Sequence, residues 1–564
     1  YQFASRQAIG AGAPYGFRIF RDYYTLNYNN TLTYRKRLPN RHNLEFMIGQ
    51  ESNSQQYKYM RVESRGFPKE NFALDDMALG ESPNKPETDR WGEELISFFG
   101  RVNYSHLDKY LATVTLRADG SSKFGTNSKW GYFPSASVAW RINEEEFLRD
   151  VDVLSNLKLR LSYGTTGNNR IGTFRSLSRM SSSWQSFNNE TNASYHSSQL
   201  PNPDLKWETN ISRNLGIDVG LFDQRIQLVM DLYSNETSDL LLESRVPLVS
   251  GYQTTLRNIG KTRNNGVEFT INTVNIQRKD FHWESSFNIA TNQNKVLALT
   301  DVDYFTIRTG WAGAGEFNED DYIIRVGDKL GSMYGYKWIG LYEVDDFDYD
   351  PDSRTYTVKK GIPYDPDNYP KPGYNKFENT DDSDDFINSN DKQIIGNASP
   401  DFYGGFTNTF QYKQFDLSFA FNFSIGNDVL NANKMYFTKM NNRYRNSLAM
   451  VTDRFTYIND GGENVFTFPD ELKAINERKT NASIDGSANL KFHSNYIEDG
   501  SYLRLNNLTL GYTLPTSLVS KAHISNARLY LSGYNLLLFT KYSGFDPDVN
   551  AKPNGGLTPG VDWG

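Results

Sequence analysis

Oxygen-bearing side chains recur at alternate positions between Thr380 and Asp391, in a pattern that can hold a hard cation. Carboxylate, amide and backbone carbonyl oxygens are the ligands that Ca²⁺ takes, and a loop that supplies them can wrap the ion. Two departures oppose a calcium loop: Thr380 stands where the first carboxylate is expected, and Asp385 replaces the turn-forming glycine. The alternative is a solvated acidic turn. The candidate ligands are Asp382, Asp384, Asn388, Asp391 and the carbonyl of Phe386.

Residue patterns that support catalysis are missing. The segment Ile259-Gly260-Lys261-Thr262 imitates the end of a phosphate loop, but position 255 is Thr where that loop needs Gly. The six histidines are dispersed without metal-ligand spacing, so each is expected in a turn or at the rim of the fold. There is no nucleophile-elbow motif and no cysteine. We therefore expect a protein without enzymatic activity.

Aromatic residues in the long loops are the better candidates for ligand contact. Their flat apolar faces can pack on sugar rings or peptide side chains, while nearby Asn, Asp and Arg supply hydrogen bonds. The alternatives are packing within the loops and an interface with a partner. The candidates are Trp184, Tyr195, Trp311, Tyr334, Tyr436 and Tyr444.

The elements that position these residues are strands, because apolar and polar side chains alternate with a period of two along most of the chain. In 415–424, Phe and Leu oppose Asp, Ser and Asn, so one face is apolar and the other polar. Fourteen such segments are expected: 17–36, 43–63, 93–106, 109–119, 131–142, 156–165, 208–222, 225–240, 263–277, 281–297, 402–412, 415–426, 502–514 and 526–540.

Short and long connections alternate between these segments. The short ones lie near 40–42, 107–108, 223–224, 278–280 and 413–414; the long ones lie near 64–92, 166–207, 241–262, 298–401 and 427–501. Outer-membrane barrels show this asymmetry, with the long loops outside the cell, whereas a soluble β-sandwich has no reason for it. To keep the alternation, 298–401 must add either two spanning strands or none, and we favour none.

Composition agrees with an all-β protein. Of the 564 residues 14% are aromatic, which suits strands, and no apolar run approaches the roughly 18 residues of a spanning helix. The net charge of −7 gives no basic footprint for nucleic acid. The chain begins without a recognisable signal peptide, so the leader is either removed or the chain is an internal fragment.

Several motifs together resemble one known family. The segment RADGSSKFG at 117–125, followed by WGYFPS at 130–135, is similar to the barrel signature of SusC/RagA-type TonB-dependent outer-membrane transporters of Bacteroidetes. Further similar segments are NPDLKWE at 202–208, NIGKTRNNGVE at 258–268, QIIGN at 393–397, PDFYGGF at 400–406 and EDGSYLRL at 498–505. Relatives also often carry a DxNxDGxID-like loop where the acidic segment 380–391 lies.

The resemblance implies a transmembrane antiparallel β-barrel of the 22-stranded type, with about fourteen strands here. All of 1–564 is then part of one barrel, with 298–401 and 427–501 as large extracellular loops. The plug domain, about seven leading strands and the closing strand are expected to be absent from this chain, which stops after a Gly/Pro-rich loop. Residues on the polar strand face would line the transport path, including Arg117, Asp119, Arg160, Asp218 and Glu268.

The resemblance also implies a function: import of an oligosaccharide or peptide across the outer membrane, with no required cofactor and at most a structural Ca²⁺. The implied partners are a SusD-like surface lipoprotein and, through the plug, the TonB-ExbB-ExbD complex. One alternative is a non-transporting outer-membrane barrel that binds a partner like an adhesin. Another is a soluble carbohydrate-active β protein, which the loop asymmetry and the lack of a carboxylate pair disfavour.

Overall fold

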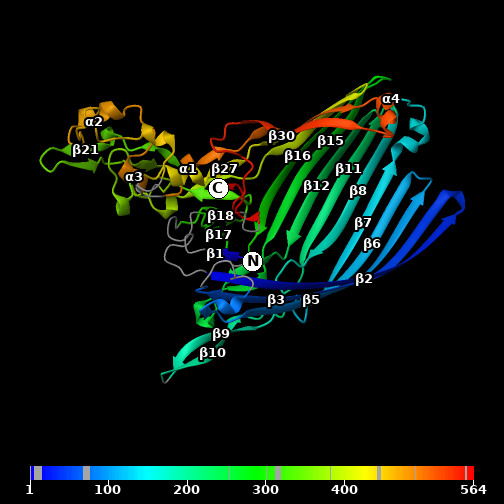
Figure 1. The fold of residues 1–564 in the computed structure, drawn as a ribbon, viewed down its shortest axis with the longest axis horizontal. Helices are drawn as coiled ribbons and strands as arrows, with labels where there is room; N and C mark the ends of the chain where they lie inside the picture. The colour runs from blue at the N-terminus through cyan, green and yellow to red at the C-terminus, as the bar shows by residue number, and fades with distance from the viewer. Residues whose placement is uncertain are drawn as a thin grey trace. The chain divides into compact units, whose positions relative to one another are not determined.

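We describe the fold from a computed structural model of the chain (Figure 1). The structure describes residues 2–4, 15–67, 76–187, 189–252, 254–299, 302–311, 319–381, 383–440, 446–488, 491–552 and 556–563. These residues divide into two compact units. The first comprises 1–149, 158–215 and 235–261, and the second 150–157, 216–234 and 262–564. Each unit is described by itself.

Each of the fourteen expected segments is a strand. The bounds are β2 (Tyr15–Leu38), β3 (His42–Arg65), β5 (Glu87–His106), β6 (Tyr110–Ser121), β7 (Trp130–Arg141), β8 (Leu154–Asn168), β11 (Glu208–Leu221), β12 (Ile226–Ser238), β15 (Lys261–Gln277), β16 (Phe281–Ala298), β25 (Phe402–Tyr412), β26 (Phe415–Ile425), β29 (Tyr502–Thr513) and β30 (Arg528–Thr540). Two short strands that alternation does not reveal complete the sheet, β1 (Gln2–Ala4) and β4 (Ser82–Pro83).

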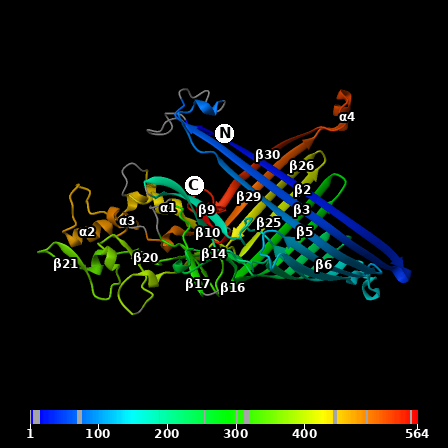
Figure 2. The same ribbon diagram turned by 90° about the horizontal axis from the view of Figure 1, so that it is seen from below.

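The long strands pair in sequence order, so the topology is an up-and-down meander. β1 pairs with β2 at the edge of this order, and β4 pairs with the last residues of β3, outside the order. In the first unit β2 pairs with β3 over their whole length, from Tyr15 with Arg65 to Leu38 with His42. In the second unit β25, β26, β29 and β30 lie side by side (Figure 2). Antiparallel neighbours with short links satisfy their backbone hydrogen bonds locally.

Several of the short turns use residues that disfavour the left-handed conformation. Between β5 and β6 the two turn residues, Leu107 and Asp108, have φ of 56° and 57°. Positive φ at two successive residues, here within the three-residue link 107–109, normally takes Asn and Gly. Pairing of His106 with Tyr110 on either side fixes this turn, so the strand register imposes the conformation on a leucine.

The two faces of the sheet differ in chemistry. On β3 the apolar face carries Leu44, Phe46 and Ile48, and the same face continues with Gln50 and Ser52. Phe46 and Ile48 are exposed, as are the neighbouring Phe98 and Leu116 on β5 and β6. Exposed alternate apolar residues across adjacent strands form the band that an outer-membrane barrel presents to lipid.

Apart from the large sheet, each unit has short strands in its loops. The first unit holds the hairpin of β9 (Arg179–Phe187) and β10 (Glu190–Gln199) and the pair of β13 (Leu241–Arg245) and β14 (Thr254–Asn258). The second unit holds β17 (Tyr304–Ile307), β18 (Tyr322–Arg325), β19 (Ser332–Gly335), β20 (Trp338–Leu341), β21 (Phe347–Asp350), β22 (Thr355–Val358), β23 (Asn375–Phe377), β24 (Gln393–Asn397), β27 (Asp428–Asn431), β28 (Ile497–Asp499) and β31 (Val561–Asp562). The described strands between 304 and 397 pair only among themselves, as expected for 298–401.

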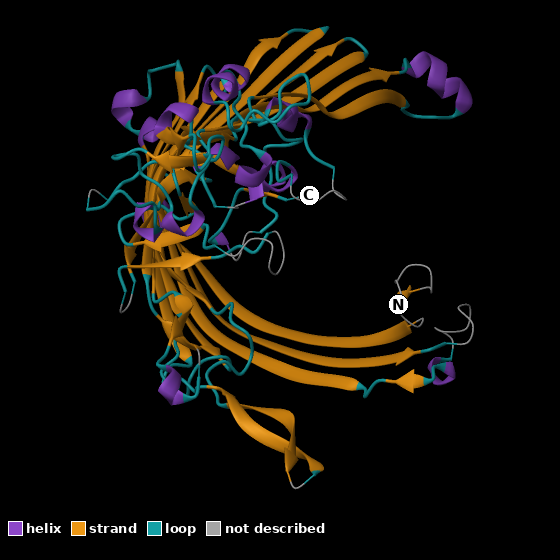
Figure 3. Ribbon diagram, turned by 90° about the vertical axis from the view of Figure 1, so that its left-hand side faces the viewer, coloured by secondary structure: helices purple, strands orange, loops and turns teal. Residues whose placement is uncertain are grey.

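Helices are few and short (Figure 3). They are α1 (Ala432–Phe437), α2 (Pro469–Asn476), α3 (Ile484–Ala488) and α4 (Thr516–Val519). Within the described part of the chain, none of them has the length and apolar character needed to cross a membrane. The loops of the second unit, 302–401 and 427–501, instead fold into a lobe with its own cores. One core gathers Trp311, Tyr322, Met333, Leu430, Ala432, Met435, Phe492 and Val561; another gathers Tyr342, Val344, Phe347, Tyr356, Phe455, Val465 and Leu472.

Leu472 on α2 tests whether this lobe is a packed structure. Its side chain is fully buried, and Leu472→Ala is expected to destabilise the lobe by about 2 to 5 kcal/mol through lost contacts and a residual cavity. The measurement is the rate of protease cleavage within 449–488 of the detergent-solubilised full-length protein, which rises as the lobe opens more often. The control Ala474→Ser, at an exposed position of the same helix, should change stability by only about 0.5 kcal/mol. Equal cleavage of both variants would contradict a packed lobe.

Candidate functional site

A polar network occupies the polar face of β3, β5 and β6. The Arg117 guanidinium donates from Nε to Asp119 at 2.7 Å and from Nη2 to Ser97 Oγ at 2.9 Å. The same Nη2 lies 3.0 Å from Glu51 Oε2. Asp119 and Ser97 are buried. Two of the expected wall residues, Arg117 and Asp119, therefore meet in one fixed network that presents hydrogen-bonding groups along the polar face.

Of the expected aromatic residues, Trp184 and Tyr195 come together. The β9–β10 hairpin pairs Trp184 with Ala193 and Tyr195 with Ser182, so both rings lie on one face of the hairpin. They are 64% and 70% exposed, and the Lys85 ammonium lies 4.3 Å from the Trp184 ring centre. Exposed rings among short polar residues give adaptable contacts of the kind that binding loops use.

The other expected aromatic residues behave differently. Trp311 is 1% exposed and packs in the lobe core with Trp563, at 5.1 Å between ring centres. This corrects its expected role, because a buried ring has no free face for a ligand. Tyr436 packs edge-on against the same Trp563 at 5.0 Å, and Tyr334 on β19 is half-buried. Tyr444 lies outside the described residues.

The acidic loop is held together by its own backbone. The buried Asp391 carboxylate accepts from the backbone N–H of Thr380 and of Asn388, both at 2.8 Å. Asp384 accepts from Phe386 N at 2.8 Å, and Asn388 Nδ2 donates to the Phe386 carbonyl at 3.4 Å. Asp382 lies outside the described residues. Among those described here, no three carboxylate or imidazole groups gather as metal ligands. The N–H groups that donate to these oxygens fit a turn, and the binding of Ca²⁺ stays a prediction.

The signature segments converge on one hydrophobic core in the first unit, here called the signature core. Phe124 from 117–125 packs on Trp207 from 202–208 at 4.9 Å between ring centres. Phe133 from 130–135 meets the same indole edge-on at 5.5 Å. Leu205 and Leu256 complete it. These motifs, distant in the chain, therefore build one packed structure.

Polar contacts lock the backbone around the signature core. Trp207 Nε1 donates to the Lys129 carbonyl at 2.9 Å, and Gly125 N donates to the Leu205 carbonyl at 3.0 Å. Segment 202–208 also bonds to 258: Lys206 N donates to Asn258 Oδ1 at 2.9 Å. A Cβ at Gly125 would lie 1.8 Å from the Pro203 carbonyl oxygen, so only glycine fits this approach.

The signature core also closes the base of the β9–β10 hairpin. Asn202 N donates to the Ser176 carbonyl at 3.0 Å, joining the segments on either side of the hairpin. Ser176 Oγ in turn donates to the Lys123 carbonyl at 3.2 Å. The hairpin that carries Trp184 and Tyr195 thus extends from a fixed base.

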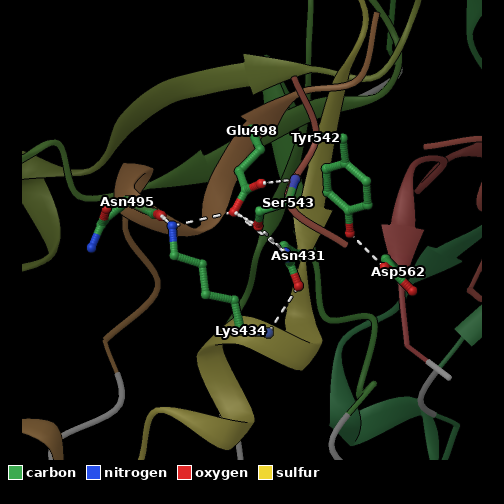
Figure 4. A network of polar contacts seen from close by, with 7 residues as sticks. All are labelled: Asn431, Lys434, Asn495, Glu498, Tyr542, Ser543 and Asp562. Carbon is green, nitrogen blue, oxygen red and sulfur yellow. Dashed lines mark hydrogen bonds and ion pairs between the residues drawn. The ribbon is translucent and has the colours of Figure 1, made fainter. Parts of the chain in front are cut away.

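Glu498, from the signature segment 498–505, lies at the centre of a polar network in the second unit (Figure 4). Its carboxylate lies 3.2 Å from Lys434 Nζ and accepts from the hydroxyl and the backbone N–H of Ser543, both at 2.9 Å. Burial alone would raise the pKa of Glu498, but the Ser543 hydrogen bonds and the Lys434 charge hold it below its usual value. A charged Glu498 therefore holds α1, β28 and the segment after β30 together.

In the same lobe, the expected position of one histidine is corrected. His493, expected in a turn or at the rim, is buried with its ring 4.2 Å from the Tyr496 ring and 5.3 Å from the Phe377 ring. Burial, together with the nearby Lys434 ammonium, lowers the pKa of His493 to about 3, so its ring is neutral. By contrast, His42 and His106 stack at 4.0 Å beside the short turns of β3 and β5, as expected.

One group of residues was missed by the sequence analysis. Tyr23, Tyr57 and Trp91 lie opposite one another on β2, β3 and β5. They belong to strands rather than loops, so a search of the long loops passes over them. Their signal is visible only with the strand register in hand.

The comparisons with known proteins agree with this architecture. Residues 1–377 match the family model described as TonB dependent receptor-like, beta-barrel. TonB-dependent receptor P3 of Formosa agariphila is 34% identical over 96% of this chain and 50% of its own length. TonB-dependent receptor SusC of Bacteroides thetaiotaomicron is 32% identical over 81% of this chain and 42% of its own length. A structure of the RagAB peptide importer in its closed-closed state superposes with a TM-score of 0.77 at 25% identity, over 98% of this chain and 55% of that one.

The chain therefore belongs to the TonB-dependent receptor β-barrel family. Its likeness to SusC and to the RagAB structure confirms the SusC/RagA-type resemblance and the outer membrane as its location. The chain spans about half the length of the curated relatives it matches.

Gly125 tests the signature core. Gly125→Ala is expected to cost about 1 to 3 kcal/mol of stability, because the new methyl group collides with backbone that cannot move freely. The measurement is the unfolding midpoint of the detergent-solubilised full-length protein, followed by near-ultraviolet circular dichroism. Gly172→Ala is the matched control, since its Cβ meets nothing nearer than Arg175 at 3.6 Å. A midpoint equally unchanged in both variants would show that the close approach has no energetic weight.

The environment of Asp321 predicts that the stability of the lobe depends on pH. Its carboxylate is fully buried and accepts from Thr309 N at 2.9 Å; burial dominates and raises its pKa to about 6 from 3.8. The folded lobe thus holds this proton more tightly than the unfolded chain. The resulting stability is complete below pH 3.8 and is lost as the pH rises through 6, a total of about 3 kcal/mol.

The measurement compares urea unfolding of the native protein and Asp321→Asn from pH 4 to pH 7.5. The variant is expected to gain about 3 kcal/mol relative to the native protein over this range, because the amide never ionises. A pH-independent difference between native protein and Asp321→Asn would refute the assignment.

Proposed function

We propose that this chain is the barrel portion of a TonB-dependent importer that takes a nutrient across the outer membrane. The observation that carries the proposal is the pair of sheet faces: an apolar, exposed band on one side and a fixed polar network on the other. A barrel wall built this way meets lipid outside and water inside. Family membership supplies the energy source, since such receptors draw on TonB.

The long strands support an importer with a tall wall. A membrane-spanning strand needs about 9 to 11 residues, whereas β2 and β3 have 24 residues each. The excess length carries the polar face well beyond the hydrocarbon, where it would form the side of a vestibule for substrate. The Arg117 network would then be part of this wall.

A SusD-like surface lipoprotein is the proposed partner. The support is the likeness to SusC and to the RagAB structure, together with the β9–β10 hairpin that exposes Trp184 and Tyr195. Aromatic residues are enriched at protein interfaces. The nutrient is an oligosaccharide or a peptide, and the proposal involves no covalent chemistry on it.

The test measures uptake by cells that express the full-length protein. We expect accumulation of the nutrient to need both this gene and tonB, and the tagged protein to copurify with a surface lipoprotein from detergent-solubilised outer membrane. Uptake that continues without tonB would contradict TonB-dependent import. Surface binding of the nutrient without any uptake would favour the non-transporting, adhesin-like alternative.

A further inference from the structure

A row of aromatic rings crosses the polar face of β2, β3 and β5. Tyr23 pairs in register with Tyr57, and Tyr57 with Trp91, so the three side chains share one face. The ring centres lie 4.7 Å and 5.2 Å apart. Tyr23 is 66% exposed, and Tyr57 and Trp91 are half-buried. These three residues, here called the aromatic row, present ring surface to solvent.

Amide side chains adjoin the aromatic row on the same face. Asn27 pairs in register with Asn53, four pairs along the strands from Tyr23 and Tyr57. Asn53 Nδ2 donates to Asn27, and Gln55 Nε2 donates to Asn53 Oδ1 at 3.2 Å. Each amide carries both donors and an acceptor, so this amide patch has capacity left to bond a ligand.

Two carboxylates near the aromatic row are paired. Glu93 lies 2.8 Å from Lys123 Nζ, and Glu51 lies 3.0 Å from Arg117 Nη2. Arg21 and Asp89, which both pair in register with Tyr59, flank the row on the same face. The side chains of the aromatic row and the amide patch themselves carry no charge.

The aromatic row lies on the face of the sheet opposite the apolar band. The exposed Leu26 and Tyr24 of β2, which pair with Ser54 and Gln56, continue that band on the other face. On the polar face the row lies six residues, or roughly 20 Å, from Glu51 in the Arg117 network. A ligand on the row would thus lie on the water-facing side of the sheet, along the same strands as the Arg117 network.

We propose that the aromatic row and the amide patch form a subsite for an uncharged oligosaccharide. The apolar face of a sugar ring packs on an aromatic ring, and its hydroxyl groups exchange hydrogen bonds with amides. A peptide would bring charged termini and side chains, whose burial needs opposite charges, and none of the side chains of the row or the patch carries a charge. The inference rests on the proposed import function and narrows its substrate from oligosaccharide or peptide to oligosaccharide.

The test uses the full-length protein purified in detergent and isothermal titration with a panel of neutral hexasaccharides of glucose, xylose, mannose and galactose. The native protein should bind at least one of them. Trp91→Ala should weaken that binding about tenfold, whereas Trp91→Phe should keep most of it because an aromatic face remains. The matched control is Tyr24→Ala, which removes an exposed tyrosine from the opposite face of the same strand as Tyr23.

Three results would overturn the subsite. The first is that no hexasaccharide of the panel binds, and the second is that Trp91→Ala and Tyr24→Ala bind with equal affinity. The third is that the native protein binds a tryptic peptide pool, and that Trp91→Ala loses this binding rather than binding to a glycan. Uptake assays separate this failure from failure of the import function. If Trp91→Ala binds the glycan as well as the native protein does and uptake still depends on TonB, only the subsite is rejected. Uptake that is independent of TonB rejects the import function even if Trp91→Ala loses its glycan.

Discussion

The need to satisfy every backbone hydrogen bond within the sheet constrains everything else in this protein. In lipid an unpaired N–H or C=O costs several kcal/mol, so strands that cross the membrane must pair along their length. Antiparallel pairing in sequence order does this with the shortest links, and it fixes which side chains share a face. The left-handed Leu107 shows how strong the constraint is, because the register is kept at the expense of local preference. The polar and apolar faces follow from the same register.

The loops solve a different problem, because they stand in water and must build their own cores. In the first unit this is done by the contact of Phe124 with Trp207, which brings together segments about eighty residues apart in the chain. In the second unit it is done by buried aromatic and aliphatic residues and by the Glu498 carboxylate, which ties three segments. Family signatures gather at these contacts. A close fit of distant segments tolerates few substitutions, whereas a binding surface changes with the ligand.

Strands were predictable from the sequence, and contacts between loops were not. Period-two alternation is a local property, so all fourteen long strands were found, while β1 and β4 are too short to show it. Trp184 and Tyr195 are exposed, since an aromatic residue within a Ser- and Asn-rich stretch has little to pack against, and their contact with a ligand stays a prediction. Trp311 and His493 were misjudged because their burial depends on segments far away in the chain: Trp563 packs on Trp311, and Phe377 packs on His493. Tyr57 and Trp91 needed the register, which no single strand reveals.

The closed base of the β9–β10 hairpin separates its tip from the wall. The Ser176–Asn202 hydrogen bond and the signature core hold both ends of the segment at a fixed spacing. What lies between them can then lengthen, shorten or change sequence without moving a strand of the sheet. Such an arrangement makes the hairpin an exchangeable part: evolution, or a designer, can replace residues 179–199 as one cassette and alter what the protein touches while the barrel wall folds as before.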